Sequence, residues 1–375
     1  MRRRFFVGVF YLSLINFCCS EKKITCCVDS INSHKYQEYN PPTTSVVKDS
    51  IINIEYFSHE FKKTGIYLNT GFQFYQRGDS NYIIYLNGDK DSLVFVNLFQ
   101  SKIKKVPINH LIGKNQKYTL RVINDTLHLL NSETYKYGQI LIDSNFNLRL
   151  LQILDLKFAF TSKNLFLNTN VVIDKKIVYE KPYLFLTYGN FKTKNNIDSK
   201  MIIKIDLETK TSKKIIDYPN KYKRCDMLDF YSTIENVSDS IFALVFHKMD
   251  FFAIINKQTE KYARVKDSFF NSQFMCYDRN LAANLAYTSK LYDNDESNDN
   301  LIYFNRSFYL IKQLGRENKA ISPKIAILVF DNTLQLRLTL YSDHLLARLS
   351  FPYKNGIVVI NDSLTKAHYY DFSKN

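Results

Sequence analysis

One unit recurs along this chain: a short apolar run that ends in Asp or Asn, a polar turn, and a shorter strand that returns. The apolar runs lie at residues 94–97, 140–143, 203–206, 253–256, 327–331 and 358–361. The side chain of Asp or Asn can accept a hydrogen bond from a backbone N–H two residues further on, and both residue types tolerate turn dihedrals. Each unit is therefore predicted to be a β-hairpin whose turn begins at the Asp or Asn.

The returning strands are predicted at residues 102–106, 148–154, 213–217, 261–265, 335–341 and 366–370. From Asn97 to Asn361 the mean spacing of the units is about 53 residues (264 divided by 5). A period of roughly 40–50 residues with four strands per unit is typical of propeller blades. We therefore predict an all-β fold, a β-propeller with six blades of mostly four antiparallel strands. A non-repeating β-sandwich or a pair of barrels is the alternative, because such hairpins occur in any β fold.

The composition of the strands agrees with this fold class. Residues 335–340 alternate between polar and apolar, which is typical of a strand with one face in water. The runs at 241–246 and 251–255 are apolar throughout, as expected of strands that are covered on both faces. The chain has 27 Tyr and 29 Phe, and both residue types favour strands.

Residues 51–375 are predicted to fold as a single propeller domain, because no linker rich in Pro, Gly or Ser separates the units. A propeller must also close its ring. We expect early strands at 51–56 and 71–75 to complete the sheet that the C-terminal strands at 357–370 begin.

The longest interval between units, from Asn256 to Asp331, holds an insertion. Its residues 281–291 have the apolar spacing of a small helix. Residues 293–300 are acidic and rich in Asn, but they lack the spacing of a calcium-binding loop. We expect them to form a solvent-exposed loop.

The N-terminal residues have the pattern of an export signal. Three arginines at positions 2–4 precede a largely apolar run at residues 5–17, which is too short for a helix across a bilayer. We predict that residues 1–18 are a signal peptide. Residues 19–50, with Pro41 and Pro42 near their end, are predicted to be a flexible tether.

Two cysteines follow the apolar run directly, and this arrangement resembles a bacterial lipobox, in which a cysteine thiol receives diacylglycerol. Cys19 is the preferred anchor, because it has the small Cys18 at the cleavage position. Cys18 is the alternative anchor, since Ile15 precedes it by three residues, although the bulky Phe17 then occupies the cleavage position. Plain secretion without a lipid is the other alternative.

The net charge of +15 points to no particular partner. Lysines are spread along the whole chain, and no run of five or more Lys or Arg occurs. Because binding to nucleic-acid phosphates requires clustered charge, we interpret the lysines as a solvated surface and expect no nucleic-acid partner.

No motif for a known chemistry is present: the chain has no Gly-rich phosphate loop, nucleophile elbow or His-Glu-x-x-His sequence. No two histidines have metal-ligand spacing, so strand-borne structural roles are expected for His34, His59, His110, His128, His247, His344 and His368. Outside the anchor pair the cysteines are Cys26, Cys27, Cys225 and Cys276. Since two of these lie in the tether, we expect no disulfide scaffold, metal or cofactor.

One pair of segments suggests a ligand site. Arg224 and Asp226 flank Cys225, and Asp278 and Arg279 follow closely after Cys276. The two cysteines are 51 residues apart, which is close to one repeat. Equivalent positions in adjacent blades would bring the four charged residues near the central channel, where propellers often bind ligands. Chance is the alternative explanation.

The Cys-Cys-Ser start, the Pro-bearing tether and the repeated hairpins together resemble an uncharacterised family of six-bladed β-propeller lipoproteins of gut-type Gram-negative anaerobes. The resemblance implies export, a lipid anchor and a propeller, and it supplies no catalytic residues.

Two functions fit this reading. The first is a non-catalytic binding or assembly module at the cell envelope that presents a rigid disc to an envelope protein or glycan. The alternative is an exported enzyme, a hydrolase or lyase, acting on a polysaccharide or related polymer. The expected location is the outer membrane or periplasm with a lipid anchor, and the alternative is a soluble periplasmic or secreted protein.

Overall fold

The structure is a computed structural model of the 375-residue chain. It describes residues 48–53, 73–87, 91–97, 99–100, 102–112, 118–131, 134–160, 165–167, 177–190, 200–217, 232–247, 251–260, 262–266, 297–314, 324–343, 345–361 and 365–372.

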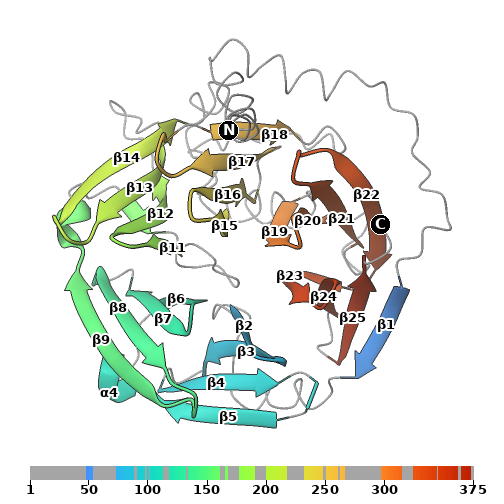
Figure 1. Ribbon diagram of the computed structural model, residues 1–375, viewed down its shortest axis with the longest axis horizontal. Helices are drawn as coiled ribbons and strands as arrows, with labels where there is room; N and C mark the ends of the chain where they lie inside the picture. Colours follow the sequence, from blue (N-terminus) through green and yellow to red (C-terminus); the bar gives the residue numbers. More distant parts are fainter. Residues whose placement is uncertain are drawn as a thin grey trace, which may run out of the picture.

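Six antiparallel sheets surround a common axis as the blades of a β-propeller, which we number 1 to 6 in chain order (Figure 1). Blade 1 consists of β2 (Gln73–Arg77), β3 (Ser80–Leu86), β4 (Ser92–Asn97) and β5 (Lys102–Pro107). Blade 2 consists of β6 (Tyr118–Ile123), β7 (Thr126–Asn131), β8 (Lys136–Ile142) and β9 (Leu148–Asp155). Blade 3 consists of β10 (Leu165–Leu167), β11 (Ile177–Glu180), β12 (Tyr183–Asn190), β13 (Lys200–Asp206) and β14 (Thr211–Asp217).

The second half of the ring repeats this plan. Blade 4 consists of β15 (Ser232–Ser238), β16 (Ile241–Phe246), β17 (Phe251–Asn256) and β18 (Tyr262–Lys266). Blade 5 consists of β19 (Ser297–Phe304), β20 (Ser307–Gln313), β21 (Lys324–Asp331) and β22 (Leu336–Asp343). Blade 6 consists of β23 (Leu345–Tyr353), β24 (Gly356–Asn361), β25 (Lys366–Asp371) and the N-terminal β1 (Lys48–Asn53). The predicted six-bladed propeller with mostly four antiparallel strands per blade is confirmed.

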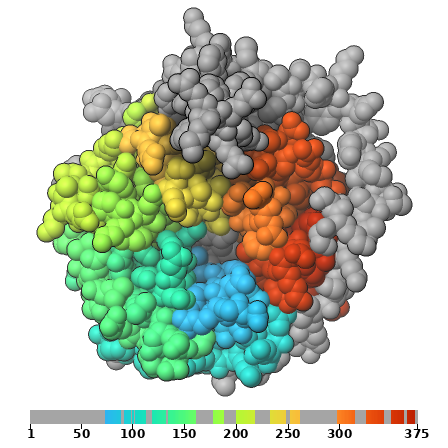
Figure 2. All heavy atoms as spheres, in the orientation of Figure 1, coloured from blue at the N-terminus to red at the C-terminus, as the bar shows by residue number. Residues whose placement is uncertain are grey.

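Within each blade the chain runs from the axis outward, except that β1 forms the outer edge of blade 6, so β2, β6, β11, β15, β19 and β23 lie nearest the axis (Figure 1). Figure 2 shows the blades as consecutive sectors of colour around the centre. The described residues outside the strands include a single turn of helix, α4 (Asn109–Ile112), and a short 3₁₀ segment at Lys157–Ala159. The helix predicted at 281–291 lies outside the described residues.

The ring closes through the first strand of the chain. β1 pairs antiparallel with β25, from Lys48 opposite Asp371 to Asn53 opposite Lys366, and so becomes the outermost strand of blade 6. The expectation that an early strand completes the C-terminal sheet is therefore correct for the first of the two segments, although the strand begins at Lys48 rather than at residue 51. Residues 48–50 thus belong to the propeller and not to the predicted tether, because they pair with β25. The expectation is wrong for residues 71–75, because β2 pairs with β3 and forms the inner edge of blade 1.

The Asp or Asn of each recurring unit lies at or directly after the end of a strand, and its Oδ1 atom accepts two backbone N–H groups of the following turn. In blades 1 to 5 this strand is the neighbour of the outermost one, and in blade 6 it is β24, the second strand from the axis. The acceptors, each with its donors in parentheses, are Asn97 (Phe99, Gln100), Asp143 (Asn145, Asn147), Asp206 (Glu208, Thr209), Asn256 (Gln258, Thr259), Asp331 (Thr333, Gln335) and Asn361 (Thr365, Lys366). The hairpin chemistry predicted from the sequence is present in all six blades.

The core of the protein lies between the blades. Six hydrophobic clusters of buried residues each fill one interface between neighbouring blades. In β3, for example, Ile83 packs with Val358 of blade 6, whereas the next residue, Ile84, packs with Leu129 of blade 2. Because successive side chains of a strand point to opposite faces, a strand between two neighbours must be apolar at every position. This explains the uniformly apolar runs of the sequence.

The acidic stretch at 293–300 corrects one expectation. Its last four residues, Ser297–Asn300, are not an exposed loop but the buried start of β19. Polar side chains tolerate burial when they have hydrogen-bond partners, and the neighbouring blades supply them. Residues 293–296 lie outside the described residues.

Gly356 provides a test of how closely the strands of blade 6 approach each other. A Cβ atom at this position would lie 1.7 Å from the backbone oxygen of Tyr370 in β25. We predict that Gly356→Ala lowers the free energy of unfolding by about 3 kcal/mol or more, because backbone cannot yield to the added methyl group. Urea denaturation followed by circular dichroism measures the change.

Gly138→Ala in β8 is the matched control, because its Cβ would lie 3.9 Å from the nearest atom, at ordinary contact distance. This variant is expected to change the free energy of unfolding by less than about 1 kcal/mol. Equal stability of the two variants would contradict the predicted clash.

The Asp turns predict a dependence of stability on pH. Hydrogen bonds lower the pKa of Asp143 and Asp206, and in Asp331 they outweigh burial, which by itself raises the pKa. A carboxylate with a lowered pKa stabilises the fold above its unfolded pKa of about 3.9, and this contribution is lost as the pH falls through the folded pKa. Replacing all three with Asn keeps the Oδ1 acceptor and removes the titration.

We therefore expect the free energy of unfolding to fall less steeply below about pH 4 in the triple Asp→Asn variant than in the wild type. Urea titrations at a series of pH values measure this slope. Parallel pH profiles for the two proteins would show that the turn carboxylates do not contribute to acid sensitivity.

Candidate functional site

The residues that the sequence singled out are not among those that the structure describes. Arg224, Asp226, Asp278 and Arg279, the predicted channel site, and the candidate anchors Cys18 and Cys19 all lie outside the described residues. They remain predictions. The described residues instead place polar groups together in two regions, the inner wall around the axis and the face that carries the tight turns.

Buried polar side chains gather on the innermost strands. They are Gln73, Thr119, Arg121, Ser232, Thr233, Ser297, Asn298, Asp299, Asn300 and Ser350. Several of their contacts cross from one blade to the next. Ser232 donates a hydrogen bond to Thr187 Oγ1 of blade 3 at 2.7 Å, and Asn300 donates to Ser350 Oγ of blade 6 at 2.7 Å. The inner wall thus connects the blades by polar contacts.

A buried acidic group lies between blades 4 and 5. His247, directly after β16, places Nε2 2.7 Å from Oδ1 of Asp299 in β19. The same Oδ1 atom accepts the hydroxyl of Ser297 at 2.9 Å. A nucleophilic triad places histidine between serine and carboxylate so that it can take the hydroxyl proton. Here the carboxylate is central and accepts from both, which is the arrangement of a structural contact.

Arg121 connects two blades that are not neighbours in chain order. It starts from β6 in blade 2 and donates through Nη1 to the backbone oxygen of Ile234 in blade 4, at 2.7 Å. Its Nη2 lies 3.5 Å from the carboxylate of Glu235, and both side chains are largely buried. Since blade 3 lies between blades 2 and 4 in chain order, this side chain spans two blade boundaries beside the axis.

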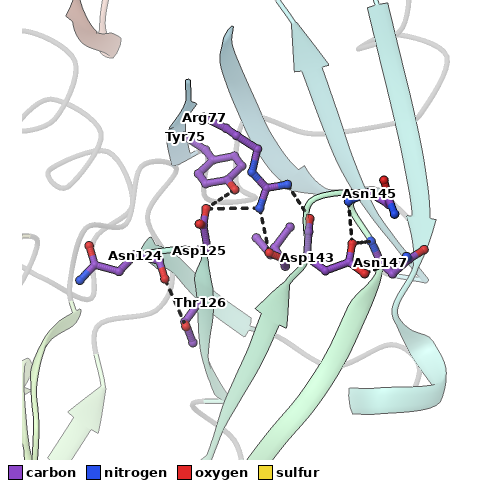
Figure 3. Close-up of polar contacts among 9 residues, drawn as sticks. Tyr75, Arg77, Asn124, Asp125, Thr126, Asp143, Asn145 and Asn147 are labelled. Carbon is purple, nitrogen blue, oxygen red and sulfur yellow. Dashed lines mark hydrogen bonds and ion pairs between the residues drawn. The ribbon is translucent and has the colours of Figure 1, made fainter. Parts of the chain in front are cut away.

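A second polar cluster lies where the turns of blades 1 and 2 meet (Figure 3). Arg77, the last residue of β2, donates to the backbone oxygens of Ile142 at 2.8 Å and Asp143 at 2.5 Å. Its Nη2 also lies 3.3 Å from Oδ1 of Asp125, which accepts the hydroxyl of Tyr75 as well. Burial, and then the hydrogen bond to Asp125, raise the pKa of the Tyr75 hydroxyl, so it stays a donor at neutral pH.

The sequence explains why these groups meet. The turn between β6 and β7 has two residues, Asn124 and Asp125, both with positive φ, and such tight turns are favoured by Asn and Asp. The turn presents Asp125 toward blade 1, where the end of β2 supplies Arg77 (Figure 3). Asp125 is half exposed and Arg77 partly so, which makes this cluster a charged feature of the turn face.

Arg77 is the last residue of the inner strand of blade 1, and other blades have different residue types at the equivalent position. In blade 3 this residue is Glu180, whose carboxylate lies 2.6 Å from the ammonium of Lys257 in blade 4. In blade 6 it is Tyr353, whose ring stacks on Phe99 of blade 1 at a centroid distance of 4.2 Å. An arginine, a carboxylate and an aromatic ring therefore perform the same structural role.

Lys257 is a buried cation with a full set of acceptors. Besides Glu180, its ammonium donates to Oδ1 of Asn236 at 2.9 Å and to the backbone oxygens of Ser238 at 2.8 Å and Asp239 at 3.2 Å. Only 4% of the residue is exposed. The lysine immediately follows the turn residue Asn256, a position that the sequence pattern marks as a turn but not as a buried charge.

The histidines take up structural positions where they are described. His128 in β7 lies 2.6 Å, through Nδ1, from the hydroxyl of Tyr137, and burial followed by the charge of Arg121 lowers its pKa to about 3. His368 also lies in a strand, whereas His110 lies in α4 and His247 lies directly after β16, so neither lies in a strand as expected. His34, His59 and His344 lie outside the described residues.

Two kinds of feature are absent from the described residues. They contain no group of three or more His, Cys, Asp or Glu side chains placed to hold a metal ion. No helix among them is both long and apolar enough to cross a membrane.

The fold and its polar inner wall define the chain as a six-bladed β-propeller. No protein-family model matches the sequence, and no curated protein matches it. Solved structures share the fold. A member of the DUF4221 family from Bacteroides vulgatus is 12% identical with a TM-score of 0.63, and the alignment covers 87% of this chain and 96% of the other. A candidate exported protein from Bacteroides fragilis NCTC 9343 is 10% identical with a TM-score of 0.50, covering 88% and 95%.

These neighbours agree with the resemblance inferred from the sequence, since both share the propeller fold and both come from Bacteroides. At this identity the similarity shows the shared fold. It does not assign a ligand or an activity to the chain.

The contacts of Lys257 predict a large loss of stability when they are removed. Lys257→Ala leaves the Glu180 carboxylate and three other acceptors without their donor, and breaking a buried ion pair typically costs about 3–5 kcal/mol. Lys213→Ala is the control, because this lysine also contacts a carboxylate, that of Glu260, but is 58% exposed. An exposed pair contributes at most about 1 kcal/mol.

Equilibrium unfolding in urea at neutral pH measures both variants. Losses of stability that differ by less than about 1 kcal/mol would show that the blade 3–blade 4 contact through Lys257 is dispensable.

Proposed function

We propose that this protein is an exported, lipid-anchored β-propeller that acts as a non-catalytic binding or assembly module at the cell envelope. The lipid anchor is Cys19, or alternatively Cys18, and the partner is an envelope protein or a glycan. The predicted tether, which must end before β1 begins at Lys48, holds the propeller away from the membrane surface.

One observation carries the binding role: in the described part of the inner wall, two pairs of ionisable side chains contact each other across blade boundaries. Arg121 contacts Glu235, and His247 contacts Asp299, with the carboxylate of Asp299 accepting two hydrogen bonds. Acid–base catalysis needs a group that can exchange a proton with a substrate, whereas these four side chains contact one another and connect the blades. Such connections make a rigid disc, which suits a module that presents a fixed surface.

Two observations support export. The N-terminal sequence has a basic start, a short apolar run and a cysteine pair, and one of the structural neighbours is a candidate exported protein. The lipid rests on the cysteine pair alone.

The anchor is tested by replacing both Cys18 and Cys19 with Ser and fractionating the cells. A diacylglycerol modification contributes roughly 0.8 kcal/mol per buried CH₂ group, so its loss should move the protein from the membrane to the soluble fraction. Each single variant identifies the acylated cysteine, because only one of them should reproduce the double variant. A double variant that stays in the membrane fraction would rule out the lipid anchor.

The binding role is tested with the full chain as bait in detergent-solubilised membranes. A binding module should recover a specific partner, and Gly356→Ala, which disturbs blade 6, should recover less of it. The same purified protein is incubated with envelope polysaccharides. Cleavage of a polymer, together with no recovered partner, would replace the binding role with the exported hydrolase or lyase.

A further inference from the structure

The outer strands of the propeller blades differ in how they expose their free edges. An outer strand has backbone N–H and C=O groups on one side that no strand of its own blade satisfies. β5 and β14 expose lysines along this edge, a common way to keep edges apart: Lys102, Lys104, Lys105, Lys213 and Lys214. In blade 6 the corresponding edge of β25 is covered by β1.

The outer strand of blade 2, β9, carries no lysine. It exposes Leu150, Leu151 and Ile153, at 37%, 46% and 45%, which are three of the five exposed large hydrophobic residues in the described part of the chain. The other two, Leu336 and Tyr341, lie on β22. An eight-residue edge with three exposed aliphatic side chains is suited to contact with another protein strand.

Charged residues of opposite sign flank this apolar segment. Arg149 lies at one end and Asp155 at the other, and both are exposed. No described residue forms an ion pair with Arg149. The carboxylate of Asp155 accepts the backbone N–H of Lys157 at 2.9 Å and lies 3.8 Å from its ammonium, an exposed and weakly bound pair.

We propose that β9 is the contact surface for a second copy of this chain, in an antiparallel arrangement about a twofold axis at Gln152. In this register, the residue numbers of two facing residues add up to 304. Arg149 then lies opposite Asp155 of the partner subunit, and Leu151 lies opposite Ile153 of the partner subunit. The surface is self-complementary, as a twofold interface between identical subunits requires.

The charge order selects this arrangement. A parallel, in-register pairing would place Arg149 against its own copy and Asp155 against its own, and like charges directly opposite each other destabilise a strand pair. A bulge between β8 and β9 leaves Leu151 without a register partner in β8 and increases the local twist. Side-chain contacts across the axis therefore carry the interface more than a continuous backbone ladder does.

The interface is small, since one strand of eight residues meets another. We therefore expect a dissociation constant on the order of micromolar rather than nanomolar. The inference is independent of the proposed envelope function, because it concerns association of the chain with itself and needs neither the lipid nor the partner.

Sedimentation equilibrium of the full chain in detergent, at concentrations up to about 100 µM, tests the interface. Ile153→Lys should raise the dimer dissociation constant at least about tenfold, because it places an ammonium group in the apolar contact. Leu336→Lys is the matched control, with the same substitution at an exposed leucine, 41% exposed, on the outer strand of blade 5. It should leave dimerisation unchanged.

Charge reversal tests the register. Arg149→Asp and Asp155→Arg should each weaken the dimer, and the double variant, which restores opposite charges across the axis, should recover it. Circular dichroism confirms that each variant remains folded. A wild-type chain that stays monomeric at about 100 µM, or a double variant weaker than both single variants, would overturn the proposal.

Discussion

Packing between the faces of neighbouring blades is the interaction on which this structure depends. Each of the six hydrophobic clusters belongs to two blades, so no blade has a complete core of its own. In blade 1, Ile83 and Ile84 contribute to different clusters although they are adjacent in sequence. A blade at an open end would expose one apolar face, and the ring avoids this by closing through β1 and β25.

The polar groups of the inner wall follow from the same arrangement. The inner strands approach each other around the axis, and buried polar side chains gather on them. Hydrogen bonds fix the relative position of blades there more specifically than apolar contact does. Asn300 with Ser350, and His247 with Asp299, connect blades 5 and 6 and blades 4 and 5 in this way. Arg121 extends the connection over two boundaries.

Much of the fold could be predicted from the sequence because its signals are local. An Asp or Asn that accepts the N–H groups of its own turn acts within a few residues, so all six hairpins, including those at Asp143 and Asn361, could be located. The position of residues 71–75 in the ring could not be predicted, because a strand at the inner edge of a blade and a strand at the outer edge have similar local patterns. The burial of Ser297–Asn300 could not be predicted either, because a polar run resembles a loop unless its partners in other blades are known.

The polar contacts between blades could not be predicted from the sequence, because their partners are far apart along the chain. Lys257 and Glu180 are 77 residues apart in sequence, and Arg121 and Ile234 are 113 apart, so nothing in the local sequence connects them. Their pairing is a property of the closed ring. The sequence pattern could have marked the last residue of an inner strand, which a two-residue turn separates from the next strand, as a place where blades meet. It could not have indicated the chemistry used there.

That chemistry varies within this one chain, and the variation explains how the fold can persist while sequences diverge. The last residue of the inner strand meets the next blade as Arg77, Glu180 or Tyr353, through backbone oxygens, a buried ammonium or an aromatic ring. Each of these contacts joins one blade to the next, although the chemistry differs. Strands that are apolar on both faces and turns that begin at Asp or Asn impose equally weak demands on residue identity. A chain that meets these demands can share a fold at a TM-score of 0.63 with a protein to which it is 12% identical. The fold is therefore specified by the pattern common to the blades, whereas what the protein recognises must depend on residues that differ between them.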